Sequence, residues 1–376
     1  ASNNTAVGRS ALAANTTGHS NVAVGKDALL VNTTGVENTA VGQIALDANT
    51  TGGSNVAVGQ AAMSSNTTGS NNTAVGKSAV ASNTTGSQNT AVGSGALGVN
   101  STADNNTAIG YNALDANSTG SENTAVGMNA LGANTTGTSN TVMGVNALTN
   151  NTTASNNTSI GRSTLSQNTT GHSHTAVGYA ALESNTTGNE NSAFGFQALN
   201  GNTTGEGNTG LGRKTLFTNS TGGQNTAVGQ GALLANTTAS ENVAVGYDSL
   251  VANTTGTDNV AVGYHALKSN TTAGNNTAVG ANALDASTTS SSNTAVGSQA
   301  ATSLTTGDGI LALGTSAAES MTTGAANAVA GFQAGQYLTT GSNNTAFGKQ
   351  ALQSVSTGSS AANNTALGSE ALKVNT

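Results

Sequence analysis

The sequence predicts an all-β solenoid, in which the chain winds into short coils that stack on one another. Two observations lead to this prediction. A unit of seventeen residues recurs along the 376-residue chain, and a short fixed period is typical of folds whose coils bury apolar surface only against neighbouring coils. The segments of the unit are short, β-branched and interrupted by Gly, as strands joined by tight turns are.

The unit is approximately N-T-A-V-G-x-x-A-L-x-x-N-T-T-G-x-x. Its "AVG" glycine falls at Gly8 and then every seventeen residues as far as Gly348. One more copy ends in Gly368, twenty residues later, so we count 22 copies in one continuous array (1–376) with three residues inserted near 359–362. Positions are named below by their offset from this marker glycine, so that Asn15 is at +7 and Asn21 is at −4.

The unit is about half as long as the ~33 residues that helical repeats need, so β-coils fit better. We expect a two-sided β-roll or β-helix with one unit per coil. With rungs about 4.8 Å apart, the array would form a rod on the order of 100 Å long.

Two apolar columns indicate the interior. Position −1 is Val, Ile, Leu, Met or Phe in every copy except Ala330, and position −3 should face the same way because side chains alternate along a strand. Position +4 is Leu, Met or Val in 19 of 22 copies and predicts a second core column. The Ala columns at −2 and +3 suggest close approach of backbones, and the variable positions +1, +2, +5 and +6 should face solvent.

Position +7 is Asn in the first sixteen copies. The next five copies have Ser287, Leu304, Met321, Leu338 and Val355 there. In three of these the +4 residue is reduced at the same time, to Ala301, Ala318 and Gly335. A packed interior conserves volume, so positions +4 and +7 should share one interior, with the Asn pointing inward.

An inward Asn must satisfy its amide, and stacked Asn residues do so by hydrogen bonding from rung to rung. We therefore predict a structural ladder represented by Asn15, Asn32, Asn49, Asn66 and Asn83. Thr stands at +9 in all 21 copies that reach it, which predicts a second ladder on the same side, represented by Thr17, Thr34, Thr51, Thr68 and Thr85. The Asn column at −4 suggests a corner residue that starts each strand, because Asn tolerates left-handed conformations.

The Asn-Thr-Thr pattern is also an acceptor for N-linked sugar, so glycosylation of the +7 column and an exposed bare turn are the competing interpretations. A second set of acceptors occurs as "NNT" in the turn before the strand. These residues are better placed for sugar: Asn3, Asn71, Asn105, Asn156, Asn275, Asn343 and Asn363.

Chemistry-bearing motifs are scarce. No nucleotide, phosphate or metal motif is evident, so we expect no cofactor, no metal and no enzymatic activity. His172 and His174 share a segment without a third ligand, and we interpret them as incidental surface residues. Glu241 and Asp258 share a column on adjacent coils, a spacing that retaining glycosidases use, but a solvated variable column explains them better. Tyr247 and Tyr264 suggest either a sugar-stacking platform or, preferably, a cross-strand aromatic pair.

The net charge of −7 includes no cationic run, which excludes a nucleic-acid partner. No apolar run approaches the ~18 residues of a membrane helix, so this segment should not insert in a membrane. Burying one Val and one Leu per coil stabilises the fold by much less than the conformational entropy cost of ordering seventeen residues. Association with other copies, as a homotrimer or filament, should supply the rest. The chain begins and ends inside a repeat, so we expect a fragment of a longer fibre.

The motifs "NTAVG" and "NVAVG" resemble the head repeats of trimeric autotransporter adhesins, and the Asn-Thr-Thr-Gly units resemble repeat arrays of phage tail-fibre-like and surface proteins that precede an endosialidase-type chaperone domain. The resemblance covers all 22 copies and implies a trimeric, left-handed β-roll rod on a cell or virion surface. The adhesin-head unit is shorter than seventeen residues, and this sequence has no stalk, anchor or chaperone. No binding or catalytic residue carries over.

Taken together, these features predict a non-enzymatic, extracellular structural fibre or adhesin shaft that meets a surface glycan or host receptor. One alternative is an N-glycosylated extracellular filament built from the same coil. A third is an ice-binding solenoid, which needs two outward Thr columns flanking one inward residue. The adjacent Thr residues at +8 and +9 do not meet that need, because neighbours on a strand face opposite sides.

Overall fold

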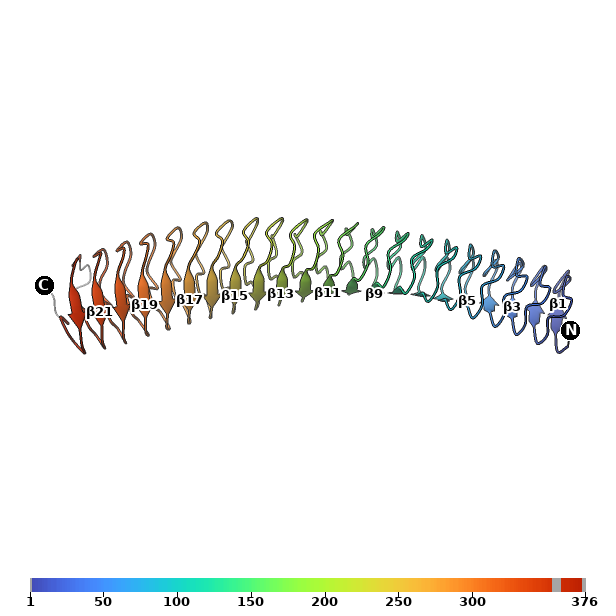
Figure 1. Cartoon of the computed structure of the whole chain (residues 1–376), viewed down its shortest axis with the longest axis horizontal. Coiled ribbons are helices and arrows are strands. Elements are labelled where there is room, and N and C mark those ends of the chain that lie inside the picture. The colour runs from blue at the N-terminus through green and yellow to red at the C-terminus, as the bar shows by residue number, and fades with distance from the viewer. Residues whose placement is uncertain (1, 354–359, 374–376) are drawn as a thin grey trace. The chain divides into compact units, whose positions relative to one another are not determined.

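The computed structural model describes residues 2–353 and 360–373. It divides into two compact units, residues 1–190 and 191–376, which are treated separately. The predicted all-β solenoid with one seventeen-residue repeat per coil is confirmed, and the described residues contain no helix. Each coil contributes one three-residue strand, and in each unit the strands stack along one side of the coils with looped backbone opposite (Figure 1).

The first unit contains β1 (Thr5–Val7), β2 (Val22–Val24), β3 (Thr39–Val41), β4 (Val56–Val58), β5 (Thr73–Val75), β6 (Thr90–Val92), β7 (Thr107–Ile109), β8 (Thr124–Val126), β9 (Thr141–Met143), β10 (Thr158–Ile160) and β11 (Thr175–Val177). The second contains β12 (Ser192–Phe194), β13 (Thr209–Leu211), β14 (Thr226–Val228), β15 (Val243–Val245), β16 (Val260–Val262), β17 (Thr277–Val279), β18 (Thr294–Val296), β19 (Leu311–Leu313), β20 (Ala328–Ala330), β21 (Thr345–Phe347) and β22 (Thr365–Leu367).

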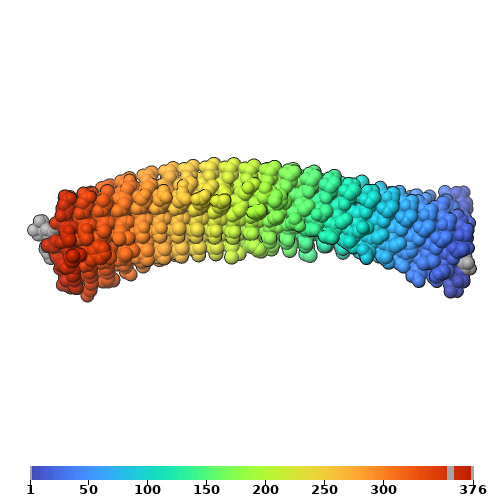
Figure 2. Space-filling model, viewed as in Figure 1, coloured from blue at the N-terminus to red at the C-terminus, as the bar shows by residue number. Residues whose placement is uncertain are grey.

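Within each unit consecutive strands pair in parallel, one repeat apart, so that Val56 lies opposite Thr39 and Thr73. Identical positions therefore line up, and their side chains form rows along each unit (Figure 2). The last pair is different, because Thr345 lies opposite Thr365, twenty residues away. This register places three added residues between β21 and β22, and residues 354–359 of that connection lie outside the described part.

The second side of the coil has no strand in the described residues, unlike the two-sided roll that was expected. Positions +2, +4 and +12 have left-handed backbone, as at Asp27 (φ 58°), Leu29 (φ 49°) and Glu37 (φ 59°). Left-handed residues at every second position, +2 and +4, prevent an extended segment. The marker glycine adds a fourth positive φ, 139° at Gly25, which side-chain-bearing residues rarely adopt.

The interior differs from the prediction at the strand. Leu at +4 is fully buried from Leu29 to Leu352, as predicted, but the strand residue that faces it is the Ala at −2. In β4, for example, Ala57 is 0% exposed whereas Val56 is 36% exposed. A Cβ on Gly210, at −2, would lie 3.4 Å from Cδ1 of Leu199. The Leu column therefore fills most of the thin coil, and the −2 position opposite it is Ala in most copies, with Val142 and Val329 as the large exceptions. Positions −3 and −1 consequently face outward.

The predicted shared interior of positions +4 and +7 is confirmed. Leu304, Met321 and Leu338 are each fully buried. A Cβ on Gly335 would lie 3.2 Å from Cδ1 of Leu338, so the +7 side chain occupies the space that the +4 residue has given up. Val355, the last member of the exchange, lies outside the described residues.

The predicted Asn ladder at +7 is confirmed. Asn32, Asn49, Asn66 and Asn83 each donate from Nδ2 to Oδ1 of the Asn one coil before, beginning at Asn15, over 2.7–3.0 Å. Each also donates to the carbonyl of the Gly at +10, as Asn49 does to Gly52 over 2.9 Å. The ladder ends at Asn270, where the next coil has Ser287 and Oδ1 of Asn270 has no hydrogen-bond partner.

A second Asn ladder occupies position −4, and the interpretation of that column as a strand-starting corner was wrong. Nδ2 of Asn38 donates to the carbonyl of Gly52 over 2.9 Å, and its backbone N–H donates to Oδ1 of Asn21 over 2.9 Å. The left-handed corner is one residue earlier, at +12. Both ladders therefore meet at the carbonyl of the +10 residue in the same coil.

The Thr ladder lies one residue earlier than predicted. Thr17, Thr34, Thr51, Thr68 and Thr85 at +9 are exposed. The +8 residue forms the ladder instead, as when Oγ1 of Thr33 donates to the carbonyl of Thr50 over 3.0 Å. The backbone bends at +8 and +9, so the alternation rule for extended strands does not apply there. Thr357, in the same +9 column, lies outside the described residues.

A double-mutant cycle tests the shared interior. Leu46→Ala should cost about 2–5 kcal/mol of unfolding free energy through its cavity. Asn49→Leu should cost about 1–3 kcal/mol, because it overpacks the coil and removes the acceptor of Asn66. The double variant copies Ala301 and Leu304, so it should be about 1–3 kcal/mol more stable than additivity predicts. Strictly additive effects in urea unfolding would contradict a common interior.

A glycine pair tests the close approach of successive coils. A Cβ on Gly59 (φ 137°) would lie 2.4 Å from the carbonyl oxygen of Gly76. Gly59→Ala should therefore destabilise the array by more than about 1 kcal/mol in thermal or urea unfolding. Gly132→Ala is the control, because its nearest neighbour, the carbonyl oxygen of Asn129, is 3.3 Å away and its φ is not positive. Equal losses in both variants would argue against this contact.

Candidate functional site: the outward strand face

The outward side chains of the strands form a continuous surface in each unit, which we call the strand face (positions −3 and −1 of each coil). Position −3 is Thr in 15 of 22 copies, and position −1 is apolar throughout. Large apolar side chains are open to solvent here: Met143 is 49% exposed, Leu211 is 49% exposed and Phe347 is 42% exposed. Contiguous exposed apolar surface of this kind marks an interaction site in soluble proteins.

The strand face is uncharged. None of the strands β1–β22 contains Asp, Glu, Lys or Arg. The side chains alternate along each strand, and the inward Asn at −4 and Ala at −2 leave −3 and −1 on the outside. The inward Asn ladder at −4 and the outward strand face therefore both follow from the same alternation of side chains along the strand.

Charged residues lie on the two rims that border the strand face. The first rim (positions +1, +2 and +5) carries all nine Lys and Arg residues and eight of the sixteen acids. The second rim (positions +11 and +12) carries the other eight acids and no Lys or Arg: Glu37, Asp104, Glu122, Glu190, Glu206, Glu241, Asp258 and Asp308. The strand face thus separates a nearly neutral rim that holds every Lys and Arg from a purely acidic rim.

Sequence reasoning missed the strand face because it placed the Val column in the core on hydrophobicity alone. Two signals could have corrected it. The −2 column is nearly all Ala, and Ala is the size that a coil filled by Leu can accept. The Asn column at −4 lies two residues before that Ala column, so both columns face the same side of the strand. If the Asn residues at −4 and +7 both point inward, the Ala at −2 must point inward as well.

Aromatic residues adjoin the strand face in the second unit. The rings of Tyr247 and Tyr264 stack with centroids 5.7 Å apart, and His265 stacks on Tyr264 at 3.8 Å. This arrangement confirms the cross-strand aromatic pair. Tyr247 is 45% exposed and Tyr264 is 52% exposed. Each stands at +1 of a coil whose strand has Val at both −3 and −1. At β15 and β16 the strand face is therefore apolar in both columns, as it also is at β2, β4 and β19.

The acids considered for catalysis lie on the acidic rim. Glu241 and Glu206 line a shallow hollow whose floor includes Gly223. Asp258 accepts a hydrogen bond from Oγ1 of Thr257 over 2.7 Å. The described residues contain no group of three or more His, Cys, Asp or Glu side chains placed to hold a metal ion.

The histidine interpretation was wrong for His174. His172 is exposed, but His174 is only 1% exposed and occupies the inward −4 position. Nδ2 of Asn185 lies 3.1 Å from its Nε2, and its backbone N–H donates to Oδ1 of Asn157. His174 therefore substitutes for Asn in the interior, where an imidazole nitrogen serves as the polar partner.

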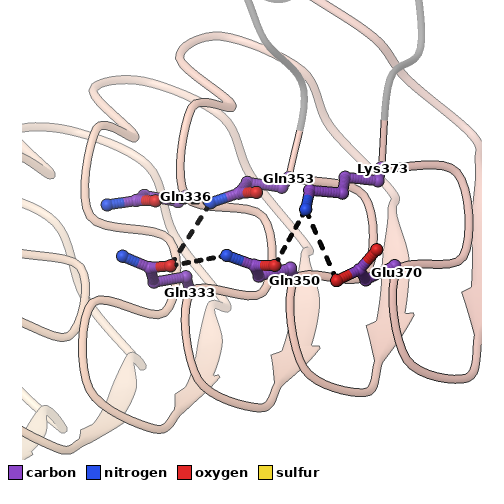
Figure 3. A network of polar contacts seen from close by, with 6 residues as sticks. All are labelled: Gln333, Gln336, Gln350, Gln353, Glu370 and Lys373. Atoms are coloured by element: carbon purple, nitrogen blue, oxygen red, sulfur yellow. Dashed lines mark hydrogen bonds and ion pairs between the residues drawn. The ribbon is translucent and has the colours of Figure 1, made fainter.

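A glutamine network occupies the first rim where the interior ladder has ended. Gln350 donates to Oε1 of Gln333 over 2.9 Å, and Gln353 donates to Oε1 of Gln336 over 2.8 Å. Lys373 donates to Oε1 of Gln350 over 3.0 Å and pairs with Glu370 at 3.5 Å (Figure 3). In these coils, rung-to-rung amide bonding runs along the rim as well as through the remaining −4 Asn residues.

The two kinds of sugar acceptor lie in opposite environments. The +7 Asn residues are buried from Asn32 to Asn270. The corner residues Asn3, Asn71, Asn105, Asn156, Asn275, Asn343 and Asn363 are exposed, with φ near 60°. Of these two sets, the structure exposes the corner residues and buries the +7 residues from Asn32 to Asn270.

Two carboxyl groups on the first rim, those of Asp47 and Asp115, lie where burial disfavours their charged form. Burial raises the pKa of Asp47, and the nearby charge of Asp27 adds to the effect, while backbone N–H groups of Asp47 and Ala48 oppose it. Oδ1 of Asp47 is buried without a hydrogen-bond partner. Burial also raises the pKa of Asp115.

No protein-family model matches the chain, and no curated protein sequence matches it. A search for membrane-spanning helices through the described ranges found none of the required length and hydropathy.

The raised pKa of Asp47 predicts an unusual pH dependence. The folded chain holds this proton more tightly than the unfolded chain, whose carboxyl titrates near 3.8, so stability is lost as pH rises from 3.8 through the folded pKa. Asp47→Asn should raise the unfolding free energy at pH 7, by less than about 1 kcal/mol for a half-exposed group, and leave it unchanged at pH 3.

Thermal unfolding at the two pH values measures this difference. Glu241→Gln on the acidic rim is the control and should show no comparable gain at pH 7. A gain for Asp47→Asn that is equal at both pH values would rule out proton linkage as its cause.

Proposed function

We propose that this chain is a non-enzymatic structural segment of an extracellular fibre or adhesin shaft, and that its copies associate side by side through the strand face. The exposed, uncharged strand face is the observation that carries this proposal. Burying its Val, Ile, Leu, Met and Phe side chains against another copy would gain roughly 25 cal/mol per Å² of apolar surface. The Thr column adds methyl groups to the same surface.

The rims favour copies that run in the same direction. If chains pack strand face to strand face around an axis parallel to the array, the acidic rim of one copy borders the first rim of the next. Six of the nine cations lie at +1, directly beside the strand face: Arg9, Lys26, Lys77, Arg162, Arg213 and Lys349. An antiparallel pair would place acidic rim against acidic rim, which repels. Parallel association agrees with the homotrimer that the adhesin resemblance implies.

The interior supports a role as a shaft. The inward side chains are Leu, Ala or hydrogen-bonded Asn in most coils. The residues of the two rims vary from coil to coil. Such an array holds its outer side chains at a fixed spacing, as an extended spacer or adhesive surface requires. We propose a surface glycan or host receptor as its target, reached by the variable rims.

Ice binding is the second candidate, and one observation favours it. The strand face has two outward columns, Thr-rich at −3 and apolar at −1, on either side of an inward Ala. These two outward columns flank one inward residue, which positions +8 and +9 do not, but only the −3 column is rich in Thr. A face buried between copies would be closed to ice, so the two functions exclude each other on the same surface.

Sedimentation equilibrium of the full chain tests the association. The wild-type chain should be a trimer, and Val75→Lys/Val92→Lys/Ile109→Lys should weaken association more than tenfold, because unpaired charges would be buried. These three side chains are 37–40% exposed, so the fold should tolerate Lys. Gln43→Lys/Gln60→Lys/Ser94→Lys adds the same charge at exposed +1 positions, where Lys26 and Lys77 already occur, and should remain assembled.

A folded, monomeric wild-type chain at micromolar concentration would refute the association. An ice-recrystallisation assay on that monomer then tests ice binding. The Val75→Lys/Val92→Lys/Ile109→Lys variant should lose inhibition of recrystallisation, and the Gln43→Lys/Gln60→Lys/Ser94→Lys control should keep it.

A further inference from the structure

We propose that N-linked sugar at position +7 and the folded coil exclude each other. The array then folds only where its fifteen buried +7 acceptors, from Asn32 to Asn270, remain unmodified during synthesis, and the folded array accepts N-linked sugar only at sequons other than these. The inference does not depend on the fibre function, because it concerns the coil itself.

The sixteen +7 Asn residues from Asn15 to Asn270 stand in an acceptor sequence, since the residue two positions later is Thr in every case. Transfer would form a bond between Nδ2 and the sugar C1 of a lipid diphosphate-linked oligosaccharide. It would break the bond between that C1 and the diphosphate carrier and release one amide proton. The modified Nδ2 would keep a single N–H.

The folded coil uses both amide hydrogens. Nδ2 of Asn66 donates to Oδ1 of Asn49 over 2.9 Å and to the carbonyl of Gly69 over 3.0 Å. A sugar on Nδ2 would remove one of these bonds and leave a buried acceptor oxygen without a donor. This costs about 1–3 kcal/mol for each rung.

Space excludes the sugar more strongly than hydrogen bonding does. A single Cβ added to Gly69 would lie 2.5 Å from Oδ1 of Asn66, 2.8 Å from Nδ2 of Asn83 and 2.3 Å from the carbonyl oxygen of Gly86. The amide is therefore enclosed by the +10 backbone of two coils and by the next rung. A site that cannot accept one carbon atom cannot accept a sugar ring.

Acceptors outside the column do not have this constraint. The seven corner Asn residues point into solvent from a left-handed turn. Asn150, at +6, begins an eighth exposed sequon, Asn-Asn-Thr, which sequence reasoning did not separate from the buried Asn151 beside it. Exposed and buried acceptors are thus interspersed along the same chain, and only folding distinguishes them.

The +9 Thr provides a matched control. Its side chain is exposed, and it is retained in copies that have lost the +7 Asn, as at Thr306 and Thr323. Thr→Ala at +9 in the sixteen Asn-bearing copies removes every acceptor of the +7 column while the Asn ladder remains. The opposite variant removes the exterior acceptors: Thr→Val at −3 after each corner Asn, which copies Val22 and Val56, together with Asn150→Ser.

The experiment compares the three full-length chains made in the secretory pathway of a eukaryotic cell, with and without an inhibitor of lipid-linked oligosaccharide synthesis. Glycopeptide mapping locates the sugar, and protease resistance measures the folded fraction. Wild-type chains with +7 sugar should be confined to the protease-sensitive fraction. The interior-acceptor variant, or the inhibitor, should raise the folded yield several-fold, and the exterior-acceptor variant should not.

Folded, protease-resistant wild-type protein with sugar on Asn32, Asn66 or another buried +7 residue would overturn the proposal. A low folded yield that neither the inhibitor nor the interior-acceptor variant raises would also overturn it, because the sugar would not be its cause. Folded wild-type protein that carries sugar at exposed sequons and none at +7 would support it.

Discussion

The structure depends on the convergence of two amide ladders on one carbonyl. In each regular coil the Asn at −4 and the Asn at +7 donate to the carbonyl of the +10 residue, as Asn38 and Asn49 do to Gly52. Each Asn oxygen accepts from the following coil, as Asn32 does from Asn49. A coil with little apolar volume is thereby closed by polar groups that have partners within it and in its neighbours.

This closure sets the rest of the cross-section. Asn at −4 and Ala at −2 face inward, so the Val and Thr columns face outward and form the strand face. The space between the ladders accepts one large apolar side chain, and Leu at +4 or Leu304-type residues at +7 supply it. The left-handed residues at +2, +4 and +12 let the chain close within seventeen residues. The apolar side chains that the fold cannot bury in the coil remain exposed on the strand face.

The same closure explains why the Asn-Thr-Thr pattern is ambiguous in the sequence. An acceptor motif and a ladder rung require the same Asn, and the Thr at +9 that completes the motif takes no part in the ladder. The rung is defined by packing around the amide, with Gly or Ala at +10 in most copies and a second Asn column eleven residues away.

The sequence alone determined the solenoid, its period, the Leu column and the inward Asn ladder, because periodicity and the Ala301/Leu304-type exchanges report packing directly. It also located the exposed corner acceptors. Tertiary structure decided which face of the strand is inside, that the −4 Asn is a rung, and that Thr33 rather than Thr34 continues the ladder. Those choices depend on the width of the coil and the bends at +8 and +9. Both arise only when neighbouring coils close around the shared carbonyl.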